Sequence, residues 1–223
     1  MHQSNNLLMK FVKRVLFVFL LFIAIYLTIG TLIARNNTVD IVKEAFDVYG
    51  SELILEELTN EQIEILLQVE DPNFNGHNGI DLKTNGAGLT TITQGMVKYL
   101  YFDEFKPGIA KLRQSLIAVF ALDAKISKDE QLRLFINSMY MGTINDEPIN
   151  GFAEASHAYF DKEFSQLTED EYIQLVAMII GPDFYNPIKN AEALEERVSR
   201  INKLLQENCE PADNRDVYYK DCL

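Results

Sequence analysis

The segment TNEQIEILLQVEDPNFNGHNGID, residues 59–81, has a pattern that the rest of the chain repeats. Thr59 followed by Gln62 is the capping-box signature of a helix start. The apolar residues that come next have helical spacing: Ile63, Leu66 and Leu67. Pro72 then forces the chain out of the helix, into a loop rich in Gly and Asn. We therefore expect a fold of capped helices joined by irregular loops.

The same start signature recurs at Ser127–Glu130 and Thr168–Glu171, each time before an apolar segment of helical spacing. Further helices are expected over residues 41–49, 108–124 and 191–206. Gly50 is placed to end the first of them. Non-helical stretches are expected at residues 71–89, 142–151 and 181–187, and loops of this kind commonly assemble a functional site. Because convincing period-two alternation is absent, the predicted fold is mainly α.

The charges are distributed unevenly along the 223 residues. The chain has 20 Lys+Arg, 33 Asp+Glu and a net charge of −13, yet residues 1–35 contain four bases and no acid. An acidic body argues against nucleic-acid binding, which needs clustered basic residues. A hydrophobic content of 48% excludes a disordered chain, and two cysteines exclude a disulfide-dense scaffold.

Residues 15–34, VLFVFLLFIAIYLTIGTLIA, form an uncharged run about 30 Å long as a helix, enough to span a bilayer. Lys10, Lys13 and Arg14 precede the run and Arg35 follows it, which predicts a cytoplasmic N-terminus. A cleaved signal peptide is the alternative, but its apolar region is usually about 7–15 residues. A core helix is the other, and no polar residue interrupts the run. We expect a single-pass anchor in the cytoplasmic (inner) membrane, with the rest of the chain extracytoplasmic.

This interpretation divides the chain into four parts. They are a cytoplasmic N-terminus (1–14), a transmembrane anchor (15–34), a folded domain (36–206) and a polar C-terminal tail (207–223). Outside the cytoplasm, Cys209 and Cys222 could form a disulfide worth about 3 kcal/mol. Two unpaired thiols are the alternative.

Glu70 is the first candidate for chemistry, because it ends an apolar helix just before Pro72. A carboxylate facing a cleft with apolar walls has a raised pKa, which suits a general base. A solvated carboxylate at a helix end is the simpler interpretation of Glu70 alone. His77 likewise fits either a base or a side chain that packs the turn.

A second candidate is an anion site at the helix that starts near Thr91 and Gln94, with Lys98 one turn further along. An ordinary capped helix with a solvated lysine is the alternative. Residues 95–128 also reverse the local charge, with three acids against six bases: Lys98, Lys106, Lys111, Arg113, Lys125 and Lys128. This cationic strip suggests an anionic ligand, unless its members are scattered over the surface. No His/Cys cluster of zinc type is present in the sequence.

Five segments in order make the chain resemble a known family. They are Glu70-Asp71-x-x-Phe74-x-x-His77-x-Gly79-x-Asp81, Thr91-Ile92-Thr93-Gln94-x-x-Val97-Lys98, Asn137-x-x-Tyr140-x-Gly142, Gly151-x-x-x-Ala155-x-x-x-Tyr159-Phe160-x-Lys162, and Leu167-Thr168-x-x-Glu171 through Tyr185-Asn186-Pro187. From about residue 59 to 205 they resemble glycosyltransferase family 51, the peptidoglycan glycosyltransferase domain of penicillin-binding proteins. No transpeptidase sequence follows, so a monofunctional, divergent member is expected.

The resemblance implies a lysozyme-like helical domain that rests on the membrane and polymerises lipid II into glycan strands, releasing undecaprenyl pyrophosphate. It implies two catalytic residues: Glu70 as the base for the acceptor's sugar 4-hydroxyl, and Lys98 beside the leaving pyrophosphate. It implies further substrate-binding residues: Asp71, Phe74, His77, Thr91, Gln94, Lys106, Lys111 and Arg113. The implied partners are lipid II, the nascent strand, the membrane and cell-wall synthases. A divalent cation, Mg²⁺ or Mn²⁺, is possible at the pyrophosphate.

The chain departs from the family in two places. Where the family has a second glutamate, this chain has Gln114 or Ser115, and only seven residues separate Asp81 from Leu89. The missing carboxylate leaves open a catalytically impaired relative that binds lipid-linked precursor or a cell-wall partner. Another carboxylate in the cleft of Glu70 would discriminate between these hypotheses; the candidates are Asp103, Glu104 and Asp123. A third hypothesis is glycan cleavage, but Lys98 and Lys106 would then have no pyrophosphate to neutralise.

Overall fold

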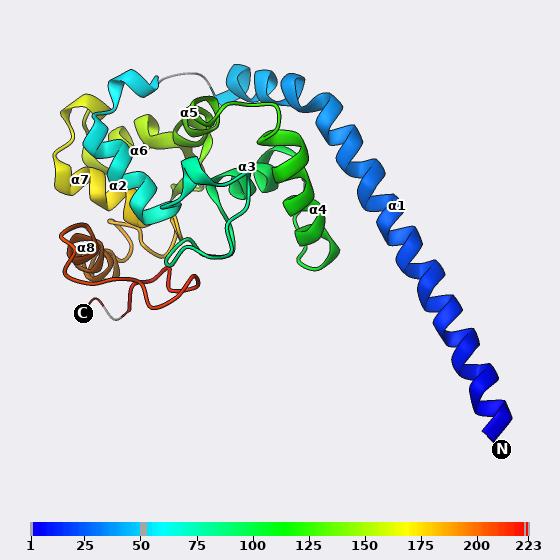
Figure 1. Ribbon diagram of the computed structural model, residues 1–223. Coiled ribbons are helices and arrows are strands. Elements are labelled where there is room, and N and C mark those ends of the chain that lie inside the picture. The colour runs from blue at the N-terminus through cyan, green and yellow to red at the C-terminus, as the bar shows by residue number, and fades with distance from the viewer. Residues whose placement is uncertain (1, 50–52, 221, 223) are drawn as a thin grey trace.

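The computed structural model describes residues 2–49, 53–220 and 222, with side-chain surroundings from residue 9 onward. It consists of one long helix, α1 (His2–Tyr49), and a helical body packed against the C-terminal part of that helix (Figure 1). The body ends in the irregular segment that follows α8 (Ala191–Leu205). The predicted mainly α fold is confirmed.

Helix α1 unites two segments that the sequence predicted separately, residues 15–34 and 41–49. No Gly or Pro lies in the intervening residues 35–40, so nothing there interrupts the helix. Gly50, predicted to end it, lies outside the described residues. The N-terminal part of α1 extends away from the body (Figure 1). Its apolar side chains from Met9 onward are largely exposed. By length and composition the helix fits a single membrane span.

The C-terminal part of α1 packs on the body through one face. Its main contacts are with α4 (Ile109–Ile117) and the π-helical turn η3 (Ala118–Leu122), and it also touches α3 (Ile92–Leu100) and α5 (Lys128–Ser138). Five buried residues at helical spacing form this face: Thr31, Ala34, Thr38, Val42 and Ala45. Arg35 also donates a hydrogen bond to the carbonyl of Phe120, and Tyr101 donates to Thr38 Oγ1 (2.9 Å). The continuous helix predicted over residues 108–124 is therefore an α-helix that continues as a π turn.

The three predicted capping boxes are confirmed, and a fourth is formed by Thr91 and Gln94. They begin four helices: α2 (Asn60–Glu70), α3 (Ile92–Leu100), α5 (Lys128–Ser138) and α7 (Glu169–Met178). In each, a Thr or Ser hydroxyl accepts from a backbone N–H of the first turn, which satisfies a donor left free at a helix start. The remaining helical elements are α6 (Gly151–Phe160) and three 3₁₀ turns, η1 (Leu55–Glu57), η2 (Phe74–Gly76) and η4 (Phe164–Gln166).

A short β-hairpin occupies the loop predicted at residues 142–151. Strands β1 (Tyr140–Ile144) and β2 (Glu147–Asn150) pair antiparallel and pack beside α6. Asn145 and Asp146 form the connecting turn, with φ values of 52° and 67°. Asn and Asp tolerate this left-handed conformation better than most residues, which makes them suitable for a two-residue hairpin turn. The sequence predicted the absence of helix here but not the strands.

The core lies among α2, α5, α6 and α7. An aromatic cluster forms part of it: the rings of Phe152, Phe164 and Tyr172 lie 5.8–6.3 Å apart. The C-terminal tail is closed by a disulfide between Cys209 and Cys222, which confirms the predicted bridge. The tail is also more than a polar extension, since Tyr219 is fully buried. The core and the tail meet beneath the end of α2, where the site lies.

Candidate active site

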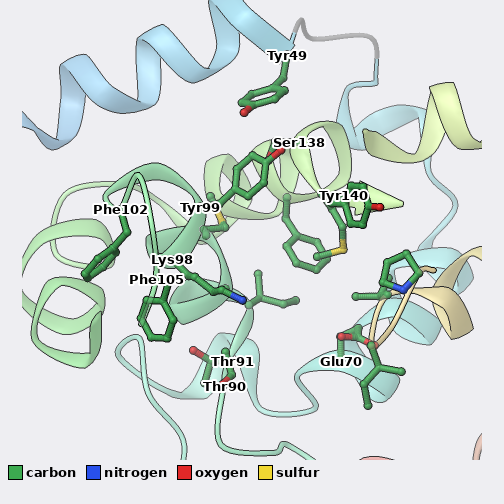
Figure 2. A pocket seen from close by; sticks show the side chains of 18 of the residues that line it. Tyr49, Glu70, Thr90, Thr91, Lys98, Tyr99, Phe102, Phe105, Ser138 and Tyr140 are labelled. Atoms are coloured by element: carbon green, nitrogen blue, oxygen red, sulfur yellow. The ribbon is translucent and has the colours of Figure 1, made fainter. Parts of the chain in front are cut away.

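A cavity of about 790 Å³ lies between the end of α2, helix α3 and the segment after α7. Its walls are largely aromatic and apolar, and they include Tyr49, Tyr99, Phe102, Phe105, Phe135 and Met139. The polar residues that line it are few: Glu70, Thr90, Thr91, Lys98, Asp103, Ser138 and Tyr140. Figure 2 shows Lys98 and Phe105 on one side of the cavity and Glu70 on the other. An apolar cavity with a few convergent polar groups is the usual form of a ligand site.

Glu70 is the last residue of α2 and is half-buried at the cavity wall. Burial raises the pKa of its carboxyl from 4.5 to about 7; the positive charge of Arg197 opposes this shift and the negative charge of Asp71 adds to it. A carboxyl group with this pKa is about half ionised near neutral pH. It can therefore accept a proton from a substrate hydroxyl and still release it again.

The loop after Glu70 is fixed by Asp71, whose side chain is fully buried. Its carboxylate accepts from the backbone N–H of Ile92, at the start of α3, and from Nε2 of His77, both at 3.0 Å. The N–H of Gly79 donates to His77 Nδ1 (3.0 Å), so the neutral ring carries its proton on Nε2. Asp71 thus ties the end of α2 to the start of α3 and holds Glu70 beside that helix.

Phe74 packs against the same buried loop. It is 2% exposed, its ring meets the His77 ring edge-on at 6.2 Å, and Lys128 Nζ lies 4.4 Å from its centroid. Asp71, Phe74 and His77 were predicted to bind substrate, but they lie behind the cavity and do not line it. In this structure they position Glu70 and the start of α3.

The start of α3 brings two predicted residues together, Thr91 and Gln94. Thr91 Oγ1 accepts from the Gln94 N–H (3.1 Å) and donates to the Gly79 carbonyl (2.8 Å). The Gln94 side chain is buried, and its amide donates to Ser115 Oγ (2.9 Å). Thr91 borders the cavity, whereas Gln94 supports the cavity from behind.

Two cations lie near each other at the cavity, Lys98 in its wall on the side away from Glu70 and Lys111 behind Thr90. Lys98 lines the cavity, with Nζ 5.6 Å from the Phe105 ring centroid. Lys111 Nζ donates to Thr90 Oγ1 (2.9 Å), and Thr90 lines the cavity too. Burial, together with the nearby charge of Lys98, lowers the pKa of Lys111. Two adjacent cations with a hydroxyl and a helix start form a setting suited to an anion.

Lys106 and Arg113, also predicted to bind substrate, point elsewhere. Lys106 pairs with Glu104 (2.9 Å), and both side chains are exposed. The guanidinium of Arg113 lies 5.0 Å from the Phe102 ring centroid. Its Nε lies 3.5 Å from where a Cβ would stand on Gly30, so Arg113 packs against α1 rather than in the cavity.

The cationic strip is therefore not continuous. Lys128 pairs with Asp123 at 2.8 Å, and Lys125 is exposed. Of the six bases between residues 95 and 128, Lys98 lines the cavity, and Lys111 lies beside it through its bond to Thr90. Spacing along the chain suggested a strip because it does not reveal the direction in which each side chain points.

The positions of the missing second glutamate carry no charge and are used internally. The Gln114 amide donates to the Gln94 carbonyl (2.6 Å), and Ser115 Oγ accepts from Gln94. Among the three alternative carboxylates, Asp103 lines the cavity of Glu70, whereas Glu104 and Asp123 pair with lysines outside it. A second carboxylate is thus present in the cavity, from a different place in the sequence.

Arg197 is a residue of the site that the sequence did not single out. It is 1% exposed, its Nε donates to the Ala177 carbonyl (2.9 Å), and its charge acts on Glu70. The available signal was its place between Leu194 and Ile201 on the apolar face of α8. A base in such a row has to find partners inside the protein.

Metal binding by the protein itself finds no support in the described part of the chain. Within residues 2–49, 53–220 and 222, no three His, Cys, Asp or Glu side chains come together to hold an ion. The described residues therefore do not fit a divalent cation held by the protein alone.

Comparisons with known proteins identify the family of the chain. The family model described as transglycosylase matches residues 41–206. Penicillin-binding protein 1B of Escherichia coli (strain K12) is 33% identical over 158 residues, which is 65% of this chain and 19% of that protein. Penicillin-binding protein 1F of Bacillus subtilis is 31% identical over 66% of this chain and 22% of that protein. Penicillin-binding protein 1A of Neisseria flavescens is 30% identical over 71% and 21%.

The chain therefore matches about a fifth of the length of these relatives, and the match includes Glu70, Lys98 and the helices that position them. The lysozyme-like helical fold that the motifs predicted is the fold of this domain. The chain belongs to the transglycosylase family, glycosyltransferase family 51, and is homologous to the transglycosylase domains of penicillin-binding proteins 1A and 1B.

Proposed function

We propose that this protein is a membrane-anchored peptidoglycan glycosyltransferase that joins lipid II units into glycan strands. Its substrates are a lipid-linked donor and an acceptor sugar with a free 4-hydroxyl. The observation that carries the proposal is one cavity with Glu70 on one side and Lys98 on the other, and with Lys111 bonded to Thr90 in its wall. A base and a cation pair face each other across a space lined with apolar side chains.

In the proposed reaction, the Glu70 carboxylate takes the proton of the acceptor's 4-hydroxyl. The freed oxygen bonds to the anomeric carbon of the donor, while the bond from that carbon to the pyrophosphate oxygen breaks. Undecaprenyl pyrophosphate leaves with the bonding electrons. The carboxyl pKa of about 7 suits this transfer, because Glu70 is then partly ionised at neutral pH.

Lys98 and Lys111 are proposed to stabilise the leaving pyrophosphate. Negative charge accumulates on that group as its bond to the sugar breaks, so fixed cations nearby lower the barrier. Lys98 lines the cavity directly, and Lys111 is held beside it by Thr90. Glycan cleavage would give these two cations no role, which favours synthesis. A divalent cation that arrives with the pyrophosphate remains a prediction of the family resemblance.

The direct test incubates the purified full-length protein with labelled lipid II and follows polymer formation. We expect polymer from the native protein and a loss of about 10³-fold in rate for Glu70→Gln. Glu64→Gln is the matched control, because Glu64 lies on the same helix and is exposed. Absence of polymer with the native protein, or equal polymer with Glu70→Gln, would contradict the proposal.

The internal use of Gln114 and Ser115 favours a second candidate: a relative that binds lipid-linked precursor or a cell-wall synthase without turnover. Asp103 in the cavity favours turnover instead. Asp103→Asn, compared with the exposed neighbour variant Glu104→Gln, separates the two. Slower polymerisation by Asp103→Asn alone supports an enzyme with a relocated carboxylate. Lipid II binding without any polymer, retained in Glu70→Gln, supports the binding protein.

Localisation follows from α1 and belongs to the same proposal. The apolar helix is proposed to cross the cytoplasmic membrane once, with Lys10, Lys13 and Arg14 inside and the helical body outside. Protease applied to the outer face of intact spheroplasts should then digest the body and spare an N-terminal tag. The reverse pattern would contradict this orientation.

A further inference from the structure

The C-terminal tail, residues 207–222, lies beyond the family match, which ends at residue 206. In Figure 1 this red segment returns from α8 to the loop that joins α2 and α3. The Cys209–Cys222 disulfide closes it, and both Tyr219 and Cys222 are buried. It is therefore a packed part of the domain, and its contacts lead to Glu70.

The tail is bonded to the loop between α2 and α3 through backbone groups. The N–H groups of Gly86 and Gly88 donate to the carbonyls of Asp213 (2.9 Å) and Asn214 (2.7 Å). The Asn214 side-chain amide donates to the Thr84 carbonyl (3.0 Å). A Cβ on Gly88, whose φ is +71°, would lie 2.8 Å from Val217 Cγ1. The loop and the tail are thus fitted closely to each other.

A second set of contacts joins the tail to Val69 and Arg197, the neighbours of the base. Tyr219 OH donates to the carbonyl of Val69, the residue before Glu70, at 2.7 Å. Arg197 Nη1 donates to the Val217 carbonyl (3.1 Å), and its guanidinium lies 5.8 Å from the Tyr219 ring centroid. Arg197 is the cation whose charge acts on Glu70. The tail therefore helps to fix both the base and its charged neighbour.

These contacts surround a smaller cavity of about 240 Å³ on the tail side of Glu70. The residues that line it are Val69, Glu70, Ala87, Gly88, Leu89, Thr90, Ile180, Arg197, Val217 and Tyr218. Glu70 and Thr90 belong to the large cavity as well, whereas Lys98 belongs to the large cavity alone. The two cavities thus adjoin at Glu70, and the small one has an aromatic side chain, Tyr218, that is 42% exposed.

We propose that the disulfide-closed tail forms a wall of the acceptor sugar's binding site, with Tyr218 as a contact for the sugar ring. The inference rests on the proposed function, in which the acceptor's hydroxyl must lie at Glu70 while the pyrophosphate lies at Lys98. The small cavity on the tail side is lined by Glu70 but not by Lys98. It can therefore hold the acceptor sugar while the pyrophosphate lies in the large cavity. The ligand of the small cavity is a hexopyranose, whose apolar ring face packs on an aromatic ring while its hydroxyls bind polar groups.

The binding test uses the full-length protein in detergent and the peptidoglycan repeat disaccharide, without lipid or pyrophosphate, as the probe. Titration followed by NMR should show binding to the native protein and at least tenfold weaker binding to Tyr218→Ala. Tyr218→Phe should bind like the native protein, because it keeps the ring. Phe184→Ala is the control, since Phe184 is an exposed aromatic residue that lines neither cavity beside Glu70.

The role of the disulfide is tested on its own, by hydrogen exchange in Cys209→Ser/Cys222→Ser. Amide exchange at Gly86 and Gly88 should accelerate at least tenfold, because the tail carbonyls no longer hold them. Exchange in α5 should stay unchanged and shows that the domain remains folded. Unchanged exchange at both glycines would overturn the proposed bracing of the loop.

The outcomes separate this inference from the proposed function. If the native protein binds the disaccharide through Tyr218 but forms no polymer, the inference stands and the enzymatic proposal fails. If the native protein polymerises lipid II, and Tyr218→Ala does so with unchanged KM, the inference fails and the enzyme stands. Equal disaccharide binding by native protein and Tyr218→Ala, or none by the native protein, also overturns the inference.

Discussion

The two ends of the cavity hold their ionisable groups in opposite ways. Glu70 is half-buried, and its pKa is raised to about 7 because burial penalises its charge. Lys98, at the other end, has an exposed side chain on the wall of the cavity. A base has to be destabilised as an anion before it will accept a proton at neutral pH. A cation that meets a pyrophosphate needs only to stay charged and accessible.

The surroundings of Glu70 and of Lys98 differ in a corresponding way. The segment that carries Glu70 is fixed from behind by the bond of Asp71 to Ile92 and by the bond of Tyr219 in the tail to Val69. The ammonium group of Lys98 lies over one aromatic ring, that of Phe105, and near Lys111. Substitutions at the Glu70 end should therefore alter both chemistry and stability, whereas substitutions at the Lys98 end should alter chemistry alone.

The largest effect at the cation end is expected for Lys98→Ala. Removing one fixed charge beside a leaving pyrophosphate should lower the rate of lipid II polymerisation about 10²-fold. Lys125→Ala, which removes an exposed lysine away from the cavity, should leave the rate unchanged. Thermal unfolding should be the same for both variants. A rate loss in Lys98→Ala that is accompanied by a loss of stability would contradict the expectation that substitutions at this end alter chemistry alone.

The next effect concerns stability at the Glu70 end. Below pH 4.5 the Glu70 carboxyl is protonated in the folded and unfolded chain alike, so its burial does not lower the free energy of unfolding. Between pH 4.5 and about 7 the unfolded chain ionises first, and the folded state loses stability. Glu70→Gln removes this cost and should raise the free energy of unfolding by about 2 kcal/mol at pH 8.

Urea denaturation of native protein, Glu70→Gln and Glu64→Gln at pH 4 and pH 8 measures this effect. The gain of Glu70→Gln should disappear at pH 4, and Glu64→Gln should show no pH-dependent gain. A Glu70→Gln protein that is less stable than the native protein at pH 8 would mean that the ionised carboxylate is stabilised where it lies. That result would show that burial is not what distinguishes Glu70 from Lys98.

The smallest effect is expected for Lys106→Ala. Lys106 pairs with Glu104 on the surface, outside the cavity, and an exposed pair of this kind contributes little. Polymerisation should change less than about twofold, in contrast to Lys98→Ala. A loss comparable to that of Lys98→Ala would show that the loop carrying Lys106 moves into the cavity when substrate binds.

Local sequence predicted the helices well because their starts are encoded within four residues. Thr59, Ser127 and Thr168 each begin a helix as predicted, and the end of α2 at Glu70 follows from Pro72. The hairpin was missed because its strands are short and its turn depends on Asn145 and Asp146 rather than on alternating residues. Local signals are strong at helix starts and weak in short strands.

The site was predictable only in part. The motifs named Glu70 and Lys98, and both line the cavity. They could not reveal that Arg113 packs against α1, or that Arg197 and the tail reach Glu70, because those contacts join segments that are distant along the chain. Directions of side chains and long-range contacts are set by tertiary packing, which composition and spacing do not record.

The central claim is that burial of Glu70 makes it the base at neutral pH, and the pH dependence of kcat/KM for lipid II polymerisation tests it most directly. Because the base must be ionised, the rate should rise with pH and level off above an apparent pKa of about 7. Below about pH 6 it should fall about tenfold per unit. The residual rate of Glu70→Gln should lack this limb. A native profile that is flat from pH 5 to 8, or a limb that persists in Glu70→Gln, would contradict the claim.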